Sequence, residues 1–292
     1  MKTSAPSQTS TGGAASPQAS GSPRPRLDSV ALSTGVTLNY AEQGDPNGVP
    51  VVMLHGFTDS WRSFEPVLPY LPKSIRAFAL TQRGHGDSSR PAGGYRTRDF
   101  AADVVAFLDA LEIERAIIVG HSMGSTNALR FAIDHPQRTR GLMLVAAFAS
   151  YRNNPVAMEF WDTAVSKLVD PIDASFVRDF QQSTLAQPVP HGLLQTAVEE
   201  SLKVPAHVWR EALGGCVEDD FVAELATVAV PTLVLWGDRD SFVPRDDQDR
   251  LLRAIAGSRL AVYAGGGHAP QWEEPARFAA DLVAFTLACS RR

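Results

Sequence analysis

The stretch Gly120-His121-Ser122-Met123-Gly124 follows the apolar run at residues 116–119 and precedes a helix-prone run at residues 125–135. A serine between a buried strand and a helix stands on a sharp turn that projects its hydroxyl into a cleft. Side chains at the flanking glycine positions would collide in such a turn, and glycine tolerates the backbone angles it needs. The pentapeptide alone also arises by chance. Its position in the chain and its partners further along the chain are what support a catalytic role. This sequence context makes Ser122 a candidate nucleophile.

Around this turn, short β-type runs alternate with segments of helical periodicity, which is typical of an α/β fold with a mostly parallel sheet. Residues 27–32 and 36–41 predict an opening hairpin. The helix after Ser122 should end near His135, because Pro136 restricts the residue before it. A last helix is expected over residues 275–288. Six further apolar runs predict buried parallel strands, at residues 51–54, 75–80, 116–119, 142–147, 232–236 and 260–263.

One region, residues 151–226, breaks this alternation. It contains no convincing strand, and helical stretches at 157–168, 174–185 and 192–202 are interrupted by prolines. An insertion after the sixth main strand would lie over the carboxyl ends of the strands, where open α/β sheets bind ligands. We therefore expect a helical lid at 151–226 between two parts of the core, 27–150 and 227–292. The alternative is a helical layer with no part in substrate binding.

The serine needs a base, because a hydroxyl without one is a poor nucleophile. Among the seven histidines, His268 has the best setting, since it follows Gly265-Gly266-Gly267 just past the last apolar strand. An acid that orients this histidine should lie between serine and histidine in the chain. Two aspartates after the strand at 232–236 compete for that role, and we prefer Asp240, which leaves Asp238 as a turn residue.

An acyl-transfer site also needs donors for the oxyanion that develops on the substrate. The stretch VVMLHGF at residues 51–57 places a tight His-Gly turn directly after a strand. The main-chain amides of Phe57 and Met123 are therefore the predicted oxyanion donors. An ordinary strand-ending turn is the alternative interpretation of HGF.

Composition and charge exclude several other classes of protein. A formal net charge of −5 without long charged runs argues against nucleic-acid binding, and Cys216 and Cys289 are too few and too far apart for a disulfide scaffold or a zinc site. Residues 1–26 contain no valine, leucine, isoleucine or aromatic residue, which predicts a disordered tail without a secretory signal. No apolar stretch is long enough to span a membrane, so a soluble cytoplasmic protein is the default expectation.

Taken together, these motifs resemble the α/β-hydrolase superfamily. The resemblance covers nearly everything from Leu27 onward and rests on HGF at 55–57, RGHGDS at 83–88, GHSMGS at 120–125, GDRD at 237–240 and GGH at 266–268. It implies Ser122, Asp240 and His268 as the catalytic triad, with Phe57 and Met123 as oxyanion donors. The family's usual spacing of the acid also favours Asp240 over Asp238. Serine at 122 excludes the relatives that use an aspartate nucleophile, namely haloalkane dehalogenases and most epoxide hydrolases.

The expected activity is cleavage of a small or medium, largely uncharged ester or lactone, with no cofactor and no metal. Acidic residues outnumber basic ones at 151–226, which disfavours a polyanionic thioester. Three alternatives stay open: a cofactor-free perhydrolase or haloperoxidase-like enzyme, a carbon–carbon bond hydrolase, and a slow-turnover ligand sensor. Carbon–carbon bond hydrolases often carry asparagine where this chain has His121. Apolar residues of the expected lid form either its core or a pocket wall: Phe160, Trp161, Phe176, Phe180, Leu193, Leu194 and Trp209.

Overall fold

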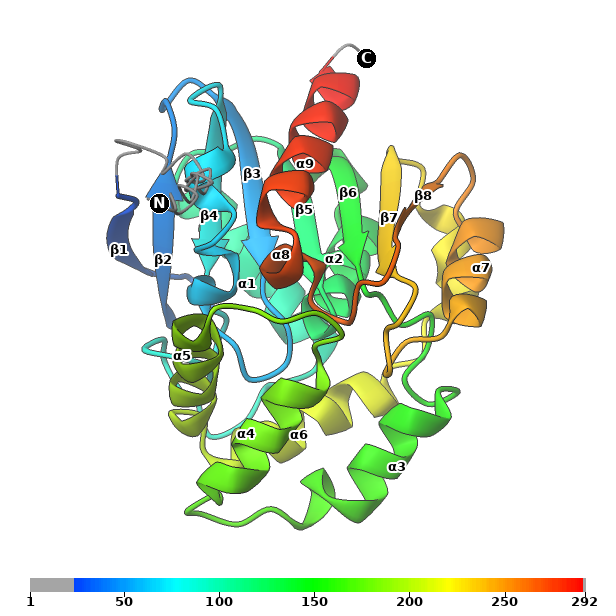
Figure 1. Cartoon of the computed structure of the whole chain (residues 1–292). Helices are drawn as coiled ribbons and strands as arrows, with labels where there is room; N and C mark the ends of the chain where they lie inside the picture. Colours follow the sequence, from blue (N-terminus) through cyan, green and yellow to red (C-terminus); the bar gives the residue numbers. More distant parts are fainter. Residues whose placement is uncertain (1–23, 291–292) are drawn as a thin grey trace, which may run out of the picture.

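The computed structural model describes residues 24–290 and contains one eight-stranded sheet (Figure 1). The predicted disordered tail falls mostly outside the described residues, and its last residue, Arg26, already begins the first strand. The strands are β1 (Arg26–Ala31), β2 (Thr37–Gln43), β3 (Val49–Leu54), β4 (Ile75–Leu80), β5 (Ala116–His121), β6 (Thr139–Val145), β7 (Thr232–Gly237) and β8 (Arg259–Tyr263).

The strand order in the sheet is β1-β2-β4-β3-β5-β6-β7-β8. Strands β1 and β2 form the predicted antiparallel hairpin, and β2 also pairs antiparallel with β4. All pairings from β4 to β8 are parallel, which confirms the mostly parallel sheet. Parallel strands end at one edge of a sheet, so the loops after β3, β5, β7 and β8 lie together there.

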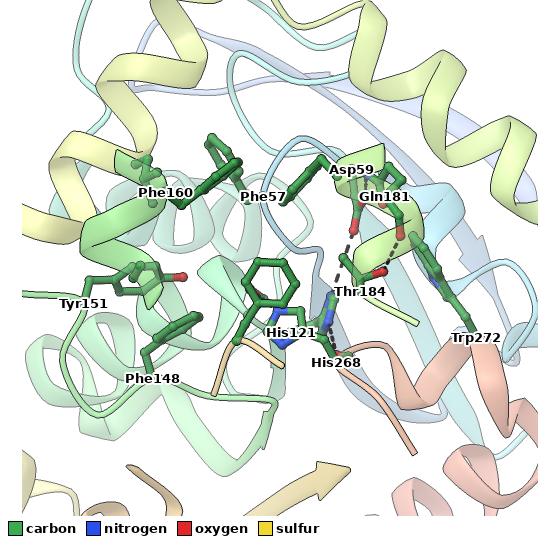
Figure 2. A pocket seen from close by; sticks show the side chains of 15 residues that line it. Phe57, Asp59, His121, Phe148, Tyr151, Phe160, Gln181, Thr184, His268 and Trp272 are labelled. Atoms are coloured by element: carbon green, nitrogen blue, oxygen red, sulfur yellow. Dashed lines mark hydrogen bonds and ion pairs between the residues drawn. The ribbon is translucent and has the colours of Figure 1, made fainter. Parts of the chain in front are cut away.

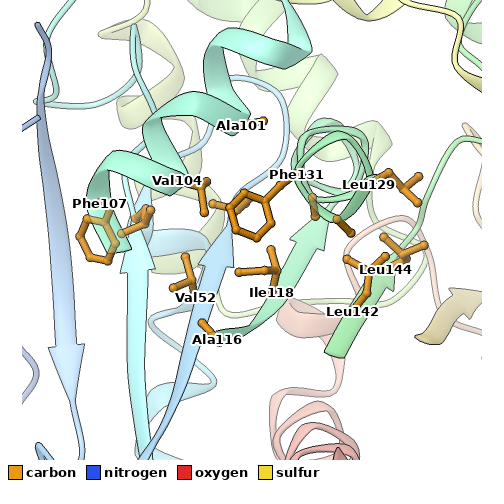
Figure 3. Packing of buried hydrophobic residues seen from close by; sticks show 14 of the residues in the cluster. Val52, Ala101, Val104, Phe107, Ala116, Ile118, Leu129, Phe131, Leu142 and Leu144 are labelled. Carbon is orange, nitrogen blue, oxygen red and sulfur yellow. The ribbon is translucent and has the colours of Figure 1, made fainter. Parts of the chain in front are cut away.

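Successive side chains of each strand point to opposite faces of the sheet and pack into two separate hydrophobic clusters, one on each face. In β5, Ile118 packs on one face, whereas Ile117 and Val119 pack on the other. The first face is covered by α1 (Thr97–Ala110), α2 (Met123–Asp134) and α7 (Arg245–Ala254). Figure 3 shows Phe131 of α2 and Val104 of α1 resting on Val52 and Ile118. Helix α2 ends one residue before His135, as the proline at 136 predicts.

The second face is covered mainly by the last helix, α9 (Pro275–Ser290), which runs across the sheet in Figure 1. Its Phe278, Leu282 and Phe285 are buried against strand residues. Four short elements complete the core: the 3-10 turns η1 (Trp61–Phe64), η2 (Leu68–Tyr70) and η3 (Pro136–Arg138), and the one-turn helix α8 (Pro270–Glu273).

Residues 151–226, here called the helical segment, contain helices and no strand and lie beyond the carboxyl ends of the parallel strands (Figure 1). The expected helix at 157–168 is broken at Ala164 into α3 and η4, and a fourth helix, α6, follows the three expected ones. Prolines at or just before their first residues set the starts of α3, α5 and α6. The elements are α3 (Pro155–Thr163), η4 (Val165–Lys167), α4 (Ala174–Ser183), α5 (His191–Leu202), α6 (Ala206–Glu218) and η5 (Val222–Thr227).

Among residues 24–290, no helix is both long and apolar enough to cross a membrane. Cys216 and Cys289 are both buried and form no disulfide.

Candidate active site

Ser122 stands in the strained turn that its sequence context predicts. It joins β5 to α2 with φ 53° and ψ −117°, a left-handed backbone conformation that is uncommon for a residue with a side chain. The flanking glycines explain why the turn can close. A Cβ on Gly120 would lie 2.2 Å from the Gly124 carbonyl oxygen, and one on Gly124 would lie 2.2 Å from the Leu54 carbonyl oxygen. Only glycine fits at both positions.

His268 bridges Ser122 and Asp240. The Ser122 hydroxyl donates to His268 Nε2 at 2.8 Å, and His268 Nδ1 donates to Asp240 Oδ2, also at 2.8 Å. Because a carboxylate only accepts hydrogen bonds, Nδ1 carries the ring proton and Nε2 is free to take a proton from the serine. The structure thus brings together the three residues that the sequence suggests as nucleophile, base and orienting acid.

The two competing aspartates have different environments. The Asp240 side chain is fully buried, and its Oδ1 accepts the main-chain N–H groups of Phe242 and Val243. Asp238 is exposed and accepts the N–H of Gly265 at 2.6 Å, as a turn residue would. Only Asp240 contacts His268.

The two candidate oxyanion donors are main-chain amides that the fold leaves without an acceptor. Phe57 follows the His-Gly turn after β3, and Met123 is the first residue of α2. Within residues 24–290, neither amide donates a hydrogen bond. The amino end of α2 adds the positive end of its helix dipole beside Ser122, which favours negative charge there.

Ser122 and His268 open onto a cavity between the sheet edge and the helical segment. Figure 2 shows its two sides: Phe57, Phe148, Tyr151 and Phe160 lie together, and Asp59, Gln181 and Thr184 lie opposite them. Burial raises the pKa of the Tyr151 phenol well above its usual value, so that this hydroxyl stays protonated. Of the described residues that line the cavity, none is a lysine or an arginine.

The apolar residues of the helical segment divide between the cavity wall and the packing behind it. Phe160 and Phe180 line the cavity, with ring centroids 5.2 Å apart in a stacked arrangement. Trp209 is fully buried behind them and packs edge-on against Phe57, with ring centroids 5.1 Å apart. The other apolar residues that the sequence suggested for the pocket wall do not line the cavity either: Trp161, Phe176, Leu193 and Leu194.

Asp59 is a site residue that the sequence analysis missed. It lies three residues after Gly56, lines the cavity and is almost fully buried. Its Oδ1 accepts Gln181 Nε2 at 3.1 Å, and its Oδ2 accepts the Ser63 hydroxyl at 3.3 Å. Burial raises the pKa of this carboxyl to about 7, and these two hydrogen bonds offset only part of the effect. Its position two residues after the HGF turn is the one signal in the sequence that could have indicated it.

His121 links the serine turn to the histidine loop. Its Nε2 donates to the main-chain carbonyl of His268 at 2.8 Å. Its Nδ1 is buried without a hydrogen-bond partner, 4.0 Å from Asp59 Oδ2. Burial, together with the charge of His268, lowers the pKa of His121 to about 3, so the ring is neutral. A Cβ on Gly56 would lie 2.7 Å from Nδ1, so this turn needs glycine as well.

The other motif residues hold the loops beneath the site. Arg83 of the RGHGDS motif pairs with Asp103 while both side chains are buried. His55 accepts the N–H of Gln82 and donates from Nδ1 to the Gly56 carbonyl, and burial lowers its pKa well below the usual value. Four histidines do not line the cavity: His85, His135, His191 and His207.

A second missed feature joins the helical segment to the histidine loop. The N–H of His268 donates to the Thr184 carbonyl at 2.8 Å. Glu273 accepts the N–H groups of Ala186 and Gln187 through Oε1, and that of Gly267 through Oε2. No sequence motif indicates the contacts between the two segments, because each of them joins residues about 85 positions apart.

Comparisons with known proteins agree with this architecture. The chain is 32% identical over 280 residues to a 2-hydroxymuconate semialdehyde hydrolase from Pseudomonas sp. (strain CF600), covering 90% of this chain and 95% of that protein. It is 28% identical to a non-heme chloroperoxidase from Streptomyces lividans, covering 89% and 99%. An esterase from Rhodococcus sp. ECU1013 superposes with a TM-score of 0.79 at 27% identity, covering 90% and 99%.

A family model described as alpha/beta hydrolase fold matches residues 49–275, which include every residue of the site described above. The match also spans the whole helical segment and the strands of the sheet from β3 to β8. With this match and the relative at 32% identity, the chain belongs to the α/β-hydrolase family.

Proposed function

We propose that this hydrolase cleaves small or medium, largely uncharged carboxylic esters or lactones through an acyl-enzyme. The observation that carries the proposal is the hydrogen-bonded chain from Ser122 through His268 to Asp240 at the floor of a largely aromatic cavity. This is the arrangement that makes a serine hydroxyl nucleophilic. In the same proposal, the helical segment is the lid of the site.

In the first half of the reaction, Ser122 Oγ bonds to the substrate carbonyl carbon while its proton passes to His268 Nε2. The carbonyl oxygen becomes an oxyanion, which accepts the amides of Phe57 and Met123. Asp240 stabilises the imidazolium that forms. The carbon–oxygen bond to the alcohol then breaks, and Nε2 returns the proton to the leaving alkoxide.

In the second half, water attacks the acyl-enzyme. His268 Nε2 takes a proton from the water as its oxygen bonds to the acyl carbon, and the same two amides hold the new oxyanion. The bond to Ser122 Oγ breaks, and the proton on Nε2 returns to the serine. The carboxylic acid leaves, and in a lactone the alcohol leaves with it as part of the same molecule.

The cavity supports an uncharged ester over the substrates of some relatives. The Pseudomonas relative is named for a muconate semialdehyde, which carries a carboxylate. A buried carboxylate needs a cationic or hydrogen-bonding partner. Among residues 24–290, no lysine or arginine lines the cavity, and the buried Asp59 would repel an anion when it is ionised. These features favour ester or lactone cleavage over cleavage of a carbon–carbon bond in an anionic substrate.

The decisive test is the Ser122→Ala variant. We expect turnover of p-nitrophenyl butyrate to fall at least about a thousandfold and labelling by a fluorophosphonate probe to disappear. Ser29→Ala, on the exposed part of edge strand β1, is the matched control and should keep both. Labelling that survives in Ser122→Ala would overturn the assignment of the nucleophile.

A substrate panel separates the proposed activity from its alternatives. It contains esters, lactones, amides, a perhydrolysis assay and a dienoate with a cleavable carbon–carbon bond. Turnover of several esters or lactones well above about one per minute supports the hydrolase, given that typical enzymes turn over at about 10 s⁻¹. Turnover below that rate on every ester and lactone, with tight ligand binding, would instead identify a ligand sensor.

A further inference from the structure

We propose that Asp59 and His121 form a subsite that binds a hydroxyl or amino group of the substrate by accepting its hydrogen bonds. The inference rests on the proposed function, because it concerns the cavity in which Ser122 would react. It adds a chemical class to that function: an ester whose apolar body carries a hydrogen-bond donor.

His121 has a buried nitrogen that lacks a hydrogen-bond partner. Its Nε2 donates to the His268 carbonyl, which places the ring proton on Nε2 and leaves a lone pair on Nδ1. The side chain is only 3% exposed, and Nδ1 has no hydrogen-bond partner. A buried acceptor without a partner is costly, and functional sites are one place where such groups persist. A ligand that donates to Nδ1 would remove this cost.

The carboxyl group of Asp59 lies beside this nitrogen. Asp59 Oδ2 lies 4.0 Å from His121 Nδ1, which is too far for a direct hydrogen bond between the two side chains. A single nitrogen or oxygen atom of a ligand can reach two acceptors at this separation, each at about 2.8–3.0 Å. Hydrogen bonds from Gln181 and Ser63 orient the Asp59 carboxyl.

The location of Asp59 and His121 also supports the subsite. Both residues line the cavity that Ser122 and His268 line, on the side opposite the aromatic group (Figure 2). Two acceptors side by side select donors and reject groups that can only accept, such as ethers and carboxylates. Above the pKa of about 7 that burial gives Asp59, the carboxylate also attracts a cation, so a primary ammonium group satisfies both acceptors.

The amino arm of the test measures inhibition of p-nitrophenyl butyrate hydrolysis at pH 8.5. The inhibitors are primary alkylamines of three to six carbons and their trimethylammonium counterparts, which carry the same charge but no N–H. A hydrogen bond to a charged partner contributes about 1.5–3 kcal/mol. At the best chain length we therefore expect the primary amine to bind at least about tenfold more tightly than its trimethylammonium counterpart. We expect this ratio of the two inhibition constants to fall to about two or less in Asp59→Leu and Asp59→Asn.

The hydroxyl arm compares p-nitrophenyl esters that carry a hydroxyl at successive positions of the acyl chain with their methoxy counterparts. At one position we expect kcat/KM to favour the hydroxyl ester about tenfold, mainly through KM, and we expect Asp59→Leu to remove the preference. Asp247→Asn is the matched control, because it alters another buried carboxyl that lies outside the cavity. It should keep both ratios.

Fluorophosphonate titration of every variant keeps the two proposals distinguishable. If Ser122 still reacts and turns over plain esters, but neither ratio exceeds about two in the wild type, the subsite is wrong and the hydrolase proposal stands. The subsite is also wrong if Asp59→Leu only slows breakdown of the acyl-enzyme, seen as a burst of p-nitrophenol, since the pair would then hold water. Loss of both ratios in Asp247→Asn would also overturn it.

Discussion

The main-chain N–H of His268 donates to the carbonyl oxygen of Thr184 at 2.8 Å, so the helical segment holds the loop that carries the base. Thr184 follows α4, and its side chain also lines the cavity. Glu273 reinforces the contact by accepting main-chain N–H groups from both loops. The position of the imidazole therefore depends on the segment above it as well as on the sheet below.

The Glu273→Ala variant tests this dependence. It leaves the N–H groups of Ala186, Gln187 and Gly267 without their acceptor. Because Glu273 is partly exposed and water can replace it in part, we expect a loss of about 2 kcal/mol in the free energy of unfolding. We also expect kcat to fall more than KM rises. Chemical denaturation and steady-state kinetics check the two effects, and Glu274→Ala, at the next position in the chain, serves as the control.

Substitutions of the two aspartates after β7 should affect kcat very differently. Asp240→Asn removes the carboxylate that accepts from His268 Nδ1, and we expect kcat to fall by about 10⁴. Asp238→Asn keeps an oxygen that can accept the Gly265 N–H, so we expect less than about a threefold change. Kinetics with a p-nitrophenyl ester provide the measurement. A larger loss in Asp238→Asn would move the role of orienting acid to that residue.

The glycines of the serine turn should not tolerate a methyl group. Gly120→Ala and Gly124→Ala each place a Cβ 2.2 Å from a main-chain oxygen, and we expect each to lower the free energy of unfolding by at least about 3 kcal/mol or to prevent folding. Gly192 in α5 is the control, because a Cβ there meets nothing within 4 Å. Gly192→Ala should be neutral or stabilise the chain by about 0.5–1 kcal/mol. Denaturant titrations of the three variants measure these changes in the free energy of unfolding.

The raised pKa of Asp59 predicts how stability depends on pH. Folding raises the pKa of this carboxyl from 3.8 to about 7, so the folded state binds the proton more tightly than the unfolded chain does. Its contribution to stability is fully present below pH 4 and is lost as the pH rises through 7. Asp59→Asn, which cannot ionise, should therefore gain in Tm relative to the wild type between pH 5 and pH 8. A Tm difference that shrinks over this range would contradict the assigned pKa.

The stacked rings of the helical segment should limit the length of the acyl chain. Phe160 lines the cavity from α3 and stacks on Phe180. Phe160→Ala removes most of a ring from the wall, and each additional buried methylene contributes about 0.8 kcal/mol. We expect the ratio of kcat/KM for p-nitrophenyl octanoate over butyrate to rise about fivefold or more. Trp161→Ala, next in sequence but outside the cavity wall, should leave the ratio near its wild-type value.

Much of the fold follows from patterns that act over short distances in the chain. Apolar runs of four to six residues predict the strands, and the turn at Ser122 is recognisable because glycine is required at both flanking positions. His268 and Asp240 could be chosen because parallel strands deliver their following loops to one edge of the sheet. The choice between Asp238 and Asp240 needed the family spacing as well, because both aspartates follow the same strand.

The residues that the sequence did not indicate depend on contacts between distant parts of the chain. Gln181 reaches Asp59 from the helical segment, 122 positions away, and neither residue belongs to a motif. The pKa of Asp59 depends on burial that exists only once the segment is packed on the core. The position of each aromatic residue in the helical segment depends on which face its helix turns toward the sheet. Phe160 and Trp161 show this, since they are neighbours in α3 and only Phe160 lines the cavity.

One hydrophobic cluster crosses the boundary between the sheet and the helical segment. It joins Phe57, Met123 and Val243 to Trp209 and Leu213 of α6. The segment therefore cannot be excised as an independent module. A chain shortened by deleting residues 151–226 would expose the apolar side chains beside the serine turn and should aggregate. Exchange of this segment between relatives would succeed only if the residues beneath it were exchanged as well.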